Sequence, residues 1–221
     1  MPCLLIADDH PLFRAALKQA ARDALGEVEL FEAGHLDAAL TLLDAQPQVD
    51  LVLLDLHMPG NHGLAGLAAI RAQYPGVAVV VVSANDDPRV VRRALDHGAA
   101  GYLPKSAGLE DLRDAIRSVL ACDTWLPPAL RASVARAASS PHDADLAARL
   151  ASLSPQQFRV LALVAQGLLN KQIADRLDVQ ERTVKAHLTA IFERLGVRNR
   201  TQASVVLREL ELSDPARLIE G

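Results

Sequence analysis

The sequence predicts a two-domain chain: an α/β domain built on a five-stranded parallel sheet, then a linker, then a small all-helical domain. The first observation is that short apolar runs alternate with segments of helical spacing up to about residue 120. The second is that proline and serine gather in residues 121–151. The third is that every later segment has helical spacing. The 221 residues suit two small domains, and the 50% of apolar residues can fill both cores.

The five expected strands are apolar runs without clear alternation, which is typical of strands that are covered on both faces. Between them lie stripes of apolar residues at helical spacing. Five such strand–helix units predict a parallel sheet with helices on both sides. The expected strands are residues 3–7, 28–33, 51–54, 77–82 and 99–103.

The second half of the chain is expected to be helical throughout. Residues 121–151 contain Pro127, Pro128 and Pro141 and are predicted to form a partly helical linker. After it, Ser154 is expected to cap a helix that has Pro155 at its first position. Four helices in about 60 residues predict a compact domain, and they are expected at 155–166, 171–177, 181–195 and 201–210. The chain thus divides into 1–120, 121–151, 152–210 and a C-terminal tail at 211–221.

Charge is unevenly spread along the chain, which has a formal net charge of −4. Residues 1–120 hold 10 Lys and Arg against 16 Asp and Glu, whereas residues 151–210 hold 9 against 5. The basic second half is a candidate for contacts with DNA phosphates. The two cysteines, Cys3 and Cys122, form neither a disulfide framework nor a metal-ligand spacing, which fits a cytoplasmic location. No apolar run approaches the roughly 20 residues of a membrane-spanning helix, so no membrane partner is expected.

Reactive side chains follow four of the five expected strands, at the ends where open parallel sheets place their binding sites. The first strand delivers Asp8 and Asp9, the third Asp55 and the fourth Ser83, and Lys105 follows the fifth. Three converging carboxylates repel one another, and a divalent cation such as Mg²⁺ or Mn²⁺ removes that repulsion. The second strand delivers no reactive group, which suits a position at the edge of the sheet.

This set of residues suits phosphoryl transfer. Asp55 can attack phosphorus and become an acyl phosphate. The Lys105 ammonium can then neutralise charge on the phosphoryl oxygens, and Ser83 can donate a hydrogen bond to one of them. Each residue alone also has a structural explanation: Asp55 or Ser83 as a helix cap, Lys105 as a surface lysine, and Asp8-Asp9 as a solvated turn. Their common position at strand ends favours a shared site.

Residues 1–120 resemble the receiver domain of two-component response regulators. The resemblance rests on the acidic pair Asp8-Asp9, on "DLHMPGNHG" starting at Asp55, on Ser83-Ala84 and on "GYLPK" ending at Lys105. It implies a flavodoxin-like (βα)5 fold. It also implies that Asp55 accepts a phosphoryl group from a sensor histidine kinase.

The same resemblance implies roles for further residues. The ligands that it assigns to Mg²⁺ are Asp9, Asp55 and the backbone carbonyl of His57, with Asp8 assisting through water. Ser83 and Tyr102 would form a switch pair that changes the surface around the fourth helix, fifth strand and fifth helix after phosphorylation. One departure is that Pro104 precedes Lys105, whereas many receivers have the lysine before the proline.

The last 70 residues contain the proportions of a helix-turn-helix, with helices at 171–177 and 181–195 around a short turn. An apolar stripe runs along the longer helix from Val184 to Leu195. The other side of that helix and the start of the preceding one carry residues suited to DNA phosphates or bases. They are Asn170, Lys171, Arg182, Thr183, Lys185, Ala186 and Thr189. The alternative is a helical bundle with a solvated basic face.

Residues 153–208 resemble the LuxR-type helix-turn-helix of the NarL/FixJ branch of response regulators. The resemblance rests on "GLLNKQIADRL", "RTVKAHL" and "RLGVRNRTQA". It implies that residues 181–195 read double-stranded DNA as part of a homodimer, with Lys185, Ala186 and Thr189 at positions that contact bases. Two departures are Gln157, where a glutamate is usual, and Thr189, where some relatives carry lysine.

The sequence therefore predicts a cytoplasmic transcription regulator in which phosphorylation of Asp55 switches dimerisation and promoter binding. One alternative is a regulator that works without phosphorylation, through partner binding. The other is a phosphatase with Asp55 as its nucleophile. Such enzymes commonly need an acid two residues further on, where this chain has His57. The only turnover expected is slow self-dephosphorylation, so the chain is not expected to be an enzyme.

Overall fold

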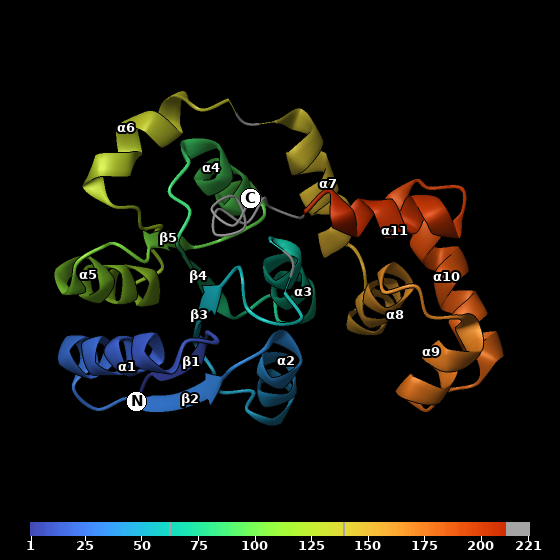
Figure 1. Cartoon of the computed structure of the whole chain (residues 1–221), viewed down its shortest axis with the longest axis horizontal. Coiled ribbons are helices and arrows are strands. Elements are labelled where there is room, and N and C mark those ends of the chain that lie inside the picture. The colour runs from blue at the N-terminus through green and yellow to red at the C-terminus, as the bar shows by residue number, and fades with distance from the viewer. Residues whose placement is uncertain (62, 139, 211–221) are drawn as a thin grey trace, which may run out of the picture.

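The computed structural model of the protein describes residues 1–61, 63–138 and 140–210. The predicted tail at 211–221 lies outside the described residues. Figure 1 shows a sheet between two layers of helices, and a helical segment that leads from this α/β domain to a group of C-terminal helices. The predicted order of an α/β domain, a linker and an all-helical domain is therefore the order observed.

Five parallel strands form one sheet in the order β2-β1-β3-β4-β5. β2 lies at an edge, as predicted from its lack of a reactive residue. Three strands end one residue later than their apolar runs predict, because strand pairing continues beyond those runs: Asp55 pairs with Val82, and Ser83 pairs with Pro104. The second and fourth strands begin one residue later than predicted, and the fifth begins two residues later. The strands are β1 (Cys3–Ala7), β2 (Glu29–Ala33), β3 (Leu51–Asp55), β4 (Ala78–Ser83) and β5 (Gly101–Pro104).

Helices cover both faces of the sheet, as predicted (Figure 1). Successive strand residues point to opposite faces, so Leu53 packs in one apolar cluster and Leu54 in the other. Both side chains are 0% exposed. One face is covered by α1 (Pro11–Leu25) and α5 (Leu109–Leu120), and the other by α2 (Leu36–Ala45), α3 (Ala65–Gln73) and α4 (Pro88–Asp96).

The linker packs onto the α/β domain instead of merely spanning a gap. Trp125 N donates a hydrogen bond to the carbonyl of Ala100 at 3.0 Å, and Tyr102 N donates to the carbonyl of Trp125 at 3.2 Å. Trp125 is buried and thereby covers the outer edge of β5. Two helices follow, α6 (Pro128–Arg136) against α4, and α7 (Pro141–Ala151) against both α3 and α4.

The junction of α4 and α7 buries a histidine. His97 is 5% exposed, and its Nε2 has no hydrogen-bond partner among the residues that the structure describes. Nearby, Arg93 Nε of α4 lies 3.1 Å from Asp143 Oδ1 of α7. Burial lowers the pKa of His97 below its ordinary 6.5. The charges of Asp143 and Asp96 oppose this lowering, and that of Arg93 adds to it.

Four helices form the C-terminal domain within the residues that the structure describes, as predicted. The cap at Ser154 is also as predicted, because its Oγ accepts a hydrogen bond from Gln157 N at 3.3 Å. Gln157 Oε1 in turn accepts from Ser154 N at 2.9 Å, so the amide that replaces the usual glutamate completes a capping box. The helices are α8 (Pro155–Ala165), α9 (Asn170–Leu177), α10 (Glu181–Leu195) and α11 (Arg200–Arg208). None of the helices in the described ranges is long and apolar enough to cross a bilayer.

Removing either buried leucine of β3 should destabilise the α/β domain. Leu53→Ala and Leu54→Ala should each lower the free energy of unfolding by about 2–5 kcal/mol, because each empties a packed site on one face of the sheet. Leu12 on α1 is 89% exposed, so Leu12→Ala should change the same quantity by about 0.5 kcal/mol or less. Urea unfolding followed by the fluorescence of Trp125, the single tryptophan, measures these changes. A loss at only one of the two leucines would contradict a sheet buried on both faces.

The buried histidine predicts a pH dependence of stability. Its folded pKa is lowered, so between that value and about 6.5 the unfolded chain binds more protons than the folded one. The free energy of unfolding should therefore fall as pH drops below about 6.5, and be restored as pH rises above it. Urea unfolding of wild type and His97→Gln at several pH values in this range measures the contribution of His97. The free energy of unfolding should change less with pH in the variant than in wild type. Equal slopes in the two proteins would show that His97 does not supply it.

Candidate functional site

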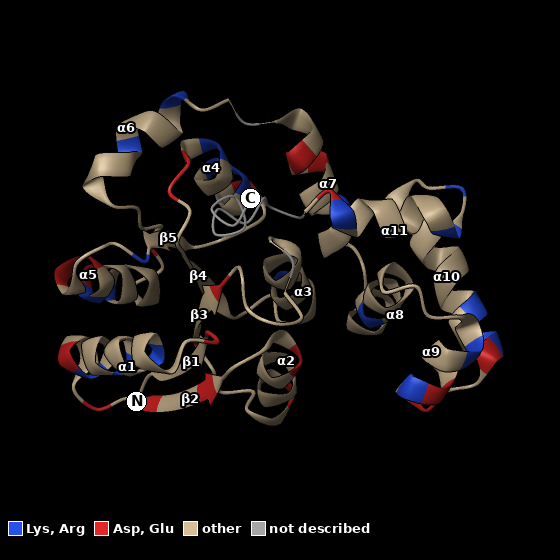
Figure 2. Cartoon of the chain, viewed as in Figure 1, with Lys and Arg blue, Asp and Glu red and all other residues tan. Residues whose placement is uncertain are grey.

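An acidic cluster lies at the carboxyl ends of β1 and β3. The two strands are neighbours in the sheet, so Asp8 and Asp9 after β1 meet Asp55 at the end of β3. One ligand atom from each of Asp8, Asp9, His10 and Asp55 lies within 4.8 Å of the others. Asp8 and Asp55 are each 1% exposed. Figure 2 shows this acidic colour at the ends of both strands. The predicted convergence of three carboxylates is therefore observed.

Lys105 supplies the positive charge of the cluster. Its Nζ lies 2.8 Å from Asp8 Oδ2 and 2.9 Å from Asp55 Oδ2, and 5.0 Å from the centre of the Phe13 ring. Burial acts to lower the pKa of Lys105, but hydrogen bonds and attraction from Asp8 and Asp55 outweigh it and hold the pKa above its ordinary value. The ammonium therefore stays charged at neutral pH, and Lys105 is no ordinary surface lysine.

The predicted switch pair lies beside the cluster. Ser83, the last residue of β4, is fully buried, and its Oγ accepts a hydrogen bond from Asn85 N at 3.2 Å. The Tyr102 hydroxyl donates to the carbonyl of the same Asn85 at 2.5 Å. Tyr102 is 0% exposed within the apolar cluster that also contains Val91 and Ala94 of α4, and this burial raises the pKa of the phenol to about 12. The two side chains thus meet at one loop residue.

The loop after Asp55 contains two contacts to the acidic residue. His57 N donates a hydrogen bond to Asp55 Oδ1 at 3.1 Å. Asn61 Nδ2 donates to the Asp55 backbone carbonyl at 2.8 Å, and Asn61 Oδ1 accepts from Gly66 N at 2.8 Å. Sequence reasoning missed Asn61, although an amide in a glycine-rich loop after a strand-end acid is a usable signal, because it can donate and accept at once. It also missed His10, whose Nδ1 lies 2.6 Å from Asp9 Oδ1.

The helix-cap alternatives for Asp55 and Ser83 do not hold. The residue before α3 is Leu64, and it makes no side-chain capping bond. The cap of α4 is Asp87, whose side chain accepts from Arg89 N. Asp55 and Ser83 instead end strands. The cluster to which Asp55 belongs offers carboxylate oxygens, which hard divalent cations take as ligands, so it can hold a metal ion.

The predicted DNA contacts gather on α9 and the first half of α10. Figure 2 shows basic segments there, at the end of the molecule away from the sheet. Two of these residues also have structural partners: Asn170 Oδ1 accepts from Arg200 Nη1 at 3.1 Å, and Lys185 Nζ lies 3.1 Å from Glu181 Oε1. Lys171, Arg182, Lys185, Ala186 and Thr189 are exposed, whereas Asn170 and Thr183 are half-buried. The apolar stripe on the opposite side, Val184 to Leu195, is buried as predicted.

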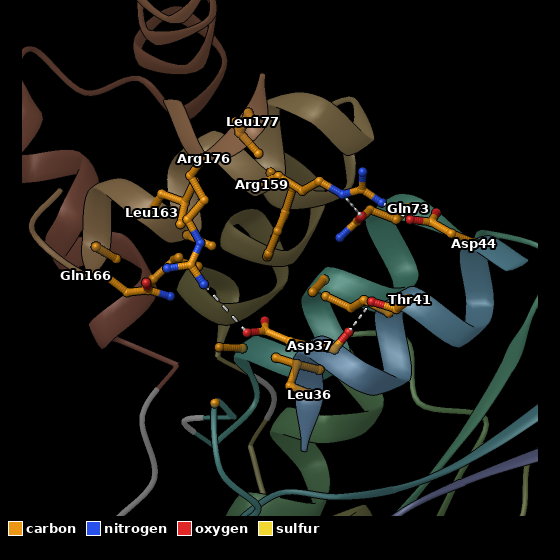
Figure 3. Close-up of a pocket in the computed structure, with 18 of the residues that line it drawn as sticks. Leu36, Asp37, Thr41, Asp44, Gln73, Arg159, Leu163, Gln166, Arg176 and Leu177 are labelled. Carbon is orange, nitrogen blue, oxygen red and sulfur yellow. Dashed lines mark hydrogen bonds and ion pairs between the residues drawn. The ribbon is translucent and has the colours of Figure 1, made fainter. Parts of the chain in front are cut away.

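The two domains also touch. A cavity of about 570 Å³ lies between α2 and α3 on one side and α8, α9 and α11 on the other (Figure 3). At one end, Arg159 forms an ion pair with Asp44, and its Nε donates to Gln73 Oε1 at 3.2 Å. At the other end, Arg176 Nη2 lies 4.0 Å from Asp37 Oδ2. Among the described residues, those that line this cavity include none of α10, and α10 lies farther from the sheet than α8 does (Figure 1).

Comparison with known proteins identifies both domains. Residues 4–117 match the response regulator receiver domain, and residues 151–207 match the luxR family of bacterial regulatory proteins. The chain is 41% identical over 213 residues to the glycerol metabolism activator of Pseudomonas putida, covering 95% of this chain and 96% of that protein. It is 35% identical over 207 residues to the nitrate/nitrite response regulator NarL of Escherichia coli K12, covering 91% and 93%.

Solved structures agree with the fold. The RcsB response regulator of Salmonella typhimurium matches with a TM-score of 0.58 and 22% identity, over 95% of this chain and 99% of that one. A LuxR family DNA-binding response regulator from Silicibacter pomeroyi matches 58% of this chain and 99% of its own with a TM-score of 0.52 and 32% identity. The chain therefore belongs to the response regulators of the NarL/FixJ type, transcription regulators that join a receiver domain to a LuxR-type DNA-binding domain.

Proposed function

We propose that Asp55 accepts a phosphoryl group from a sensor histidine kinase and that this modification switches the binding of the chain to promoter DNA. The observation that carries the proposal is the position of Asp55. Its carboxylate is buried at a strand end, 2.9 Å from the Lys105 ammonium and within one acidic cluster with Asp8 and Asp9. A helix-capping carboxylate does not need an ammonium and two further carboxylates beside it. Such an arrangement is typical of a reactive site.

In the transfer step, an Asp55 carboxylate oxygen attacks the phosphorus of a phosphohistidine. The new O–P bond forms while the N–P bond to the kinase imidazole breaks, and that imidazole leaves. Lys105, already paired with Asp55, is placed to hold the oxygens of the transferred group. Ser83, at the end of the neighbouring strand, would donate its hydroxyl hydrogen to the same group.

The residues that would hold Mg²⁺ or Mn²⁺ are Asp9, Asp55 and the backbone carbonyl of His57, with Asp8 acting through water. The ion, when bound, neutralises negative charge on the phosphoryl oxygens. The carboxylates of the cluster suit such an ion by their chemistry and spacing. His57 stands two residues after Asp55, where aspartate-nucleophile phosphatases commonly carry a carboxylic acid, so we assign only slow self-dephosphorylation to the site.

The switch would begin at the contacts of Ser83 and Tyr102 with Asn85. When the Ser83 hydroxyl turns to the phosphoryl group, its hydrogen bond to the Asn85 amide is lost. The Tyr102 ring already lies inside, so the loop after β4 would move around a ring that is in place. This loop leads directly into α4, which packs against the linker helices.

The DNA-binding unit would span residues 152–210, joined by the linker 121–151 to the receiver at 1–120. Two copies would pair, each placing α10 in a major groove, with half-sites one helical turn of about 34 Å apart or a multiple of it. RcsB, which shares the fold of this chain, has been solved as two dimers bound to two parallel DNAs. A chain that a kinase phosphorylates and that regulates promoters would work in the cytoplasm.

Labelling with acetyl phosphate tests the acceptor. Wild type should take up one phosphoryl group in a Mg²⁺-dependent manner, and Asp55→Asn should take up none, because an amide oxygen is a poor nucleophile. Asp50→Asn is the matched control, since Asp50 lies before the opposite end of the same strand and its oxygen accepts from Cys3 N at 2.8 Å, which an amide can also do. Intact-protein mass spectrometry measures the label. Equal labelling of wild type and Asp55→Asn would remove Asp55 as the acceptor.

Substitution of Lys185 tests the DNA surface. Lys185→Ala should weaken binding to a target promoter by about 1–3 kcal/mol if the ammonium contacts a base, and should lower the salt dependence if it contacts a phosphate. Lys18→Ala is the control, because Lys18 pairs with Glu32 on the receiver at 2.6 Å. Fluorescence anisotropy at several salt concentrations measures both quantities. Unchanged affinity and unchanged salt slope in Lys185→Ala would move the DNA contact away from this face.

A further inference from the structure

We propose that the side chain of Asn61 couples the state of Asp55 to the contact between the receiver and the C-terminal end of the DNA-binding domain. The inference rests on the proposed function, because it names the route by which phosphorylation of that site is transmitted. It differs from a route through α4, the helix that follows the Ser83 loop. The two routes leave the phosphorylation site on different strands and are separable by substitution.

Asn61 joins the acceptor strand to the start of α3. The side chain is 5% exposed, and both ends of its amide are used: Nδ2 donates to the Asp55 carbonyl at 2.8 Å, and Oδ1 accepts from Gly66 N at 2.8 Å. Asn61 packs directly against the Gly66 backbone, because a Cβ at Gly66 would lie 2.6 Å from Asn61 Oδ1. A displacement of the backbone at Asp55 is therefore passed to the first turn of α3.

The first turn of α3 is bonded to the DNA-binding domain. Leu64 N, two residues before Gly66, donates a hydrogen bond to the carbonyl of Leu210 at 2.9 Å. Leu210 follows α11 and is 0% exposed. One asparagine side chain and two residues of backbone thus separate the phosphorylation site from the last described residue of the other domain.

A second anchor lies beside the first. Arg93 Nη2 of α4 donates to the carbonyl of Glu209 at 2.7 Å, next to Leu210. The end of α11 is therefore held both by α3 and by α4. The α4 anchor belongs to the route from Ser83, and the α3 anchor to the route from Asp55 itself. The α3 anchor joins two residues that are each 0% exposed, whereas the Arg93 side chain of the α4 anchor is 26% exposed.

Phosphorylation acts directly on this link. It adds negative charge and bulk to the Asp55 carboxylate, which now holds His57 N at 3.1 Å and Lys105 Nζ at 2.9 Å. Those contacts must rearrange, and the loop that carries His57 also carries Asn61. A shift passed through Asn61 breaks the Leu64–Leu210 bond and frees the helical domain to pair on DNA. The contact restrains the phosphate-free protein by fixing the orientation of that domain.

Asn61→Ala and Gly66→Ala test the link from its two sides. Gly66→Ala should accept the acetyl phosphate label as wild type does, and the DNA binding of Asn61→Ala is compared with that of wild type at an equal labelled fraction. Wild type should bind promoter DNA about tenfold more tightly after labelling, within the usual range of allosteric coupling. The two variants should already bind at nearly the labelled wild-type affinity, and labelling should change it by less than about twofold.

A second readout needs neither phosphate nor DNA. Amide hydrogen exchange at Leu64, measured by NMR, should be slow in unlabelled wild type and faster in both variants. Gly76→Ala is the matched control, because a Cβ at Gly76 meets nothing within 4 Å. Circular dichroism checks folding, and if Asn61→Ala fails to fold, Gly66→Ala decides the question, since it keeps every polar group.

The outcomes separate the inference from the function on which it rests. Wild-type labelling with a full DNA response in Asn61→Ala and Gly66→Ala would overturn the coupling role and leave Asp55 as the acceptor. Loss of the response in Arg93→Ala alone would assign the signal to α4 and also overturn it. Absence of label on wild type would overturn the proposed function and the coupling with it. Faster exchange at Leu64 with a lost response in both variants would support the link.

Discussion

The ion pairs of Lys105 with Asp8 and Asp55 are the interaction on which the site depends. The order of the sheet forces β1 and β3 together, so their carboxylates meet whatever the cost of the repulsion. Asp8 and Asp55 are almost completely buried, and water screens them little. The ammonium 2.8 and 2.9 Å away offsets this cost. One ammonium therefore neutralises two buried carboxylates. Negative charge added to Asp55 would change the position of Lys105 relative to both of them.

Much of this site follows from the sequence through one rule, that parallel strands end together. Asp8, Asp55, Ser83 and Lys105 are far apart in the chain, yet each follows an apolar run of strand length. Their meeting needs only the strand order, and the lack of a reactive residue after β2 places that strand at the edge. The capping box at Ser154 is equally local, since its partner is three residues away. Short-range chemistry and a periodic core are what a sequence displays.

Other features depend on distances that no local pattern encodes. The sequence places Trp125 in a linker, but in the structure it covers β5 through backbone hydrogen bonds with Ala100 and Tyr102. In the sequence, Arg159 is one polar position on a helix, but in the structure it forms an ion pair with Asp44 of the other domain. Such contacts depend on how separately folded segments pack together. No repeating pattern in the sequence predicts that packing. Asn61 falls between these cases, because its residue type is suggestive and its partners are visible only in three dimensions.

The energetics of the interdomain contact suit a switch. The side chains of Arg159 and Asp44 are 36% and 50% exposed, and exposed ion pairs of this kind contribute only about 0–1 kcal/mol each. The Arg93–Asp143 pair, which joins α4 to the linker helix α7, is more buried, with side chains 26% and 11% exposed. A coupling free energy of about 1–3 kcal/mol is enough to shift such a contact, whereas it would leave the packed cores of the two domains intact. The Leu64–Leu210 hydrogen bond joins two buried residues, and under the proposed coupling a shift of the loop after Asp55 would break this bond.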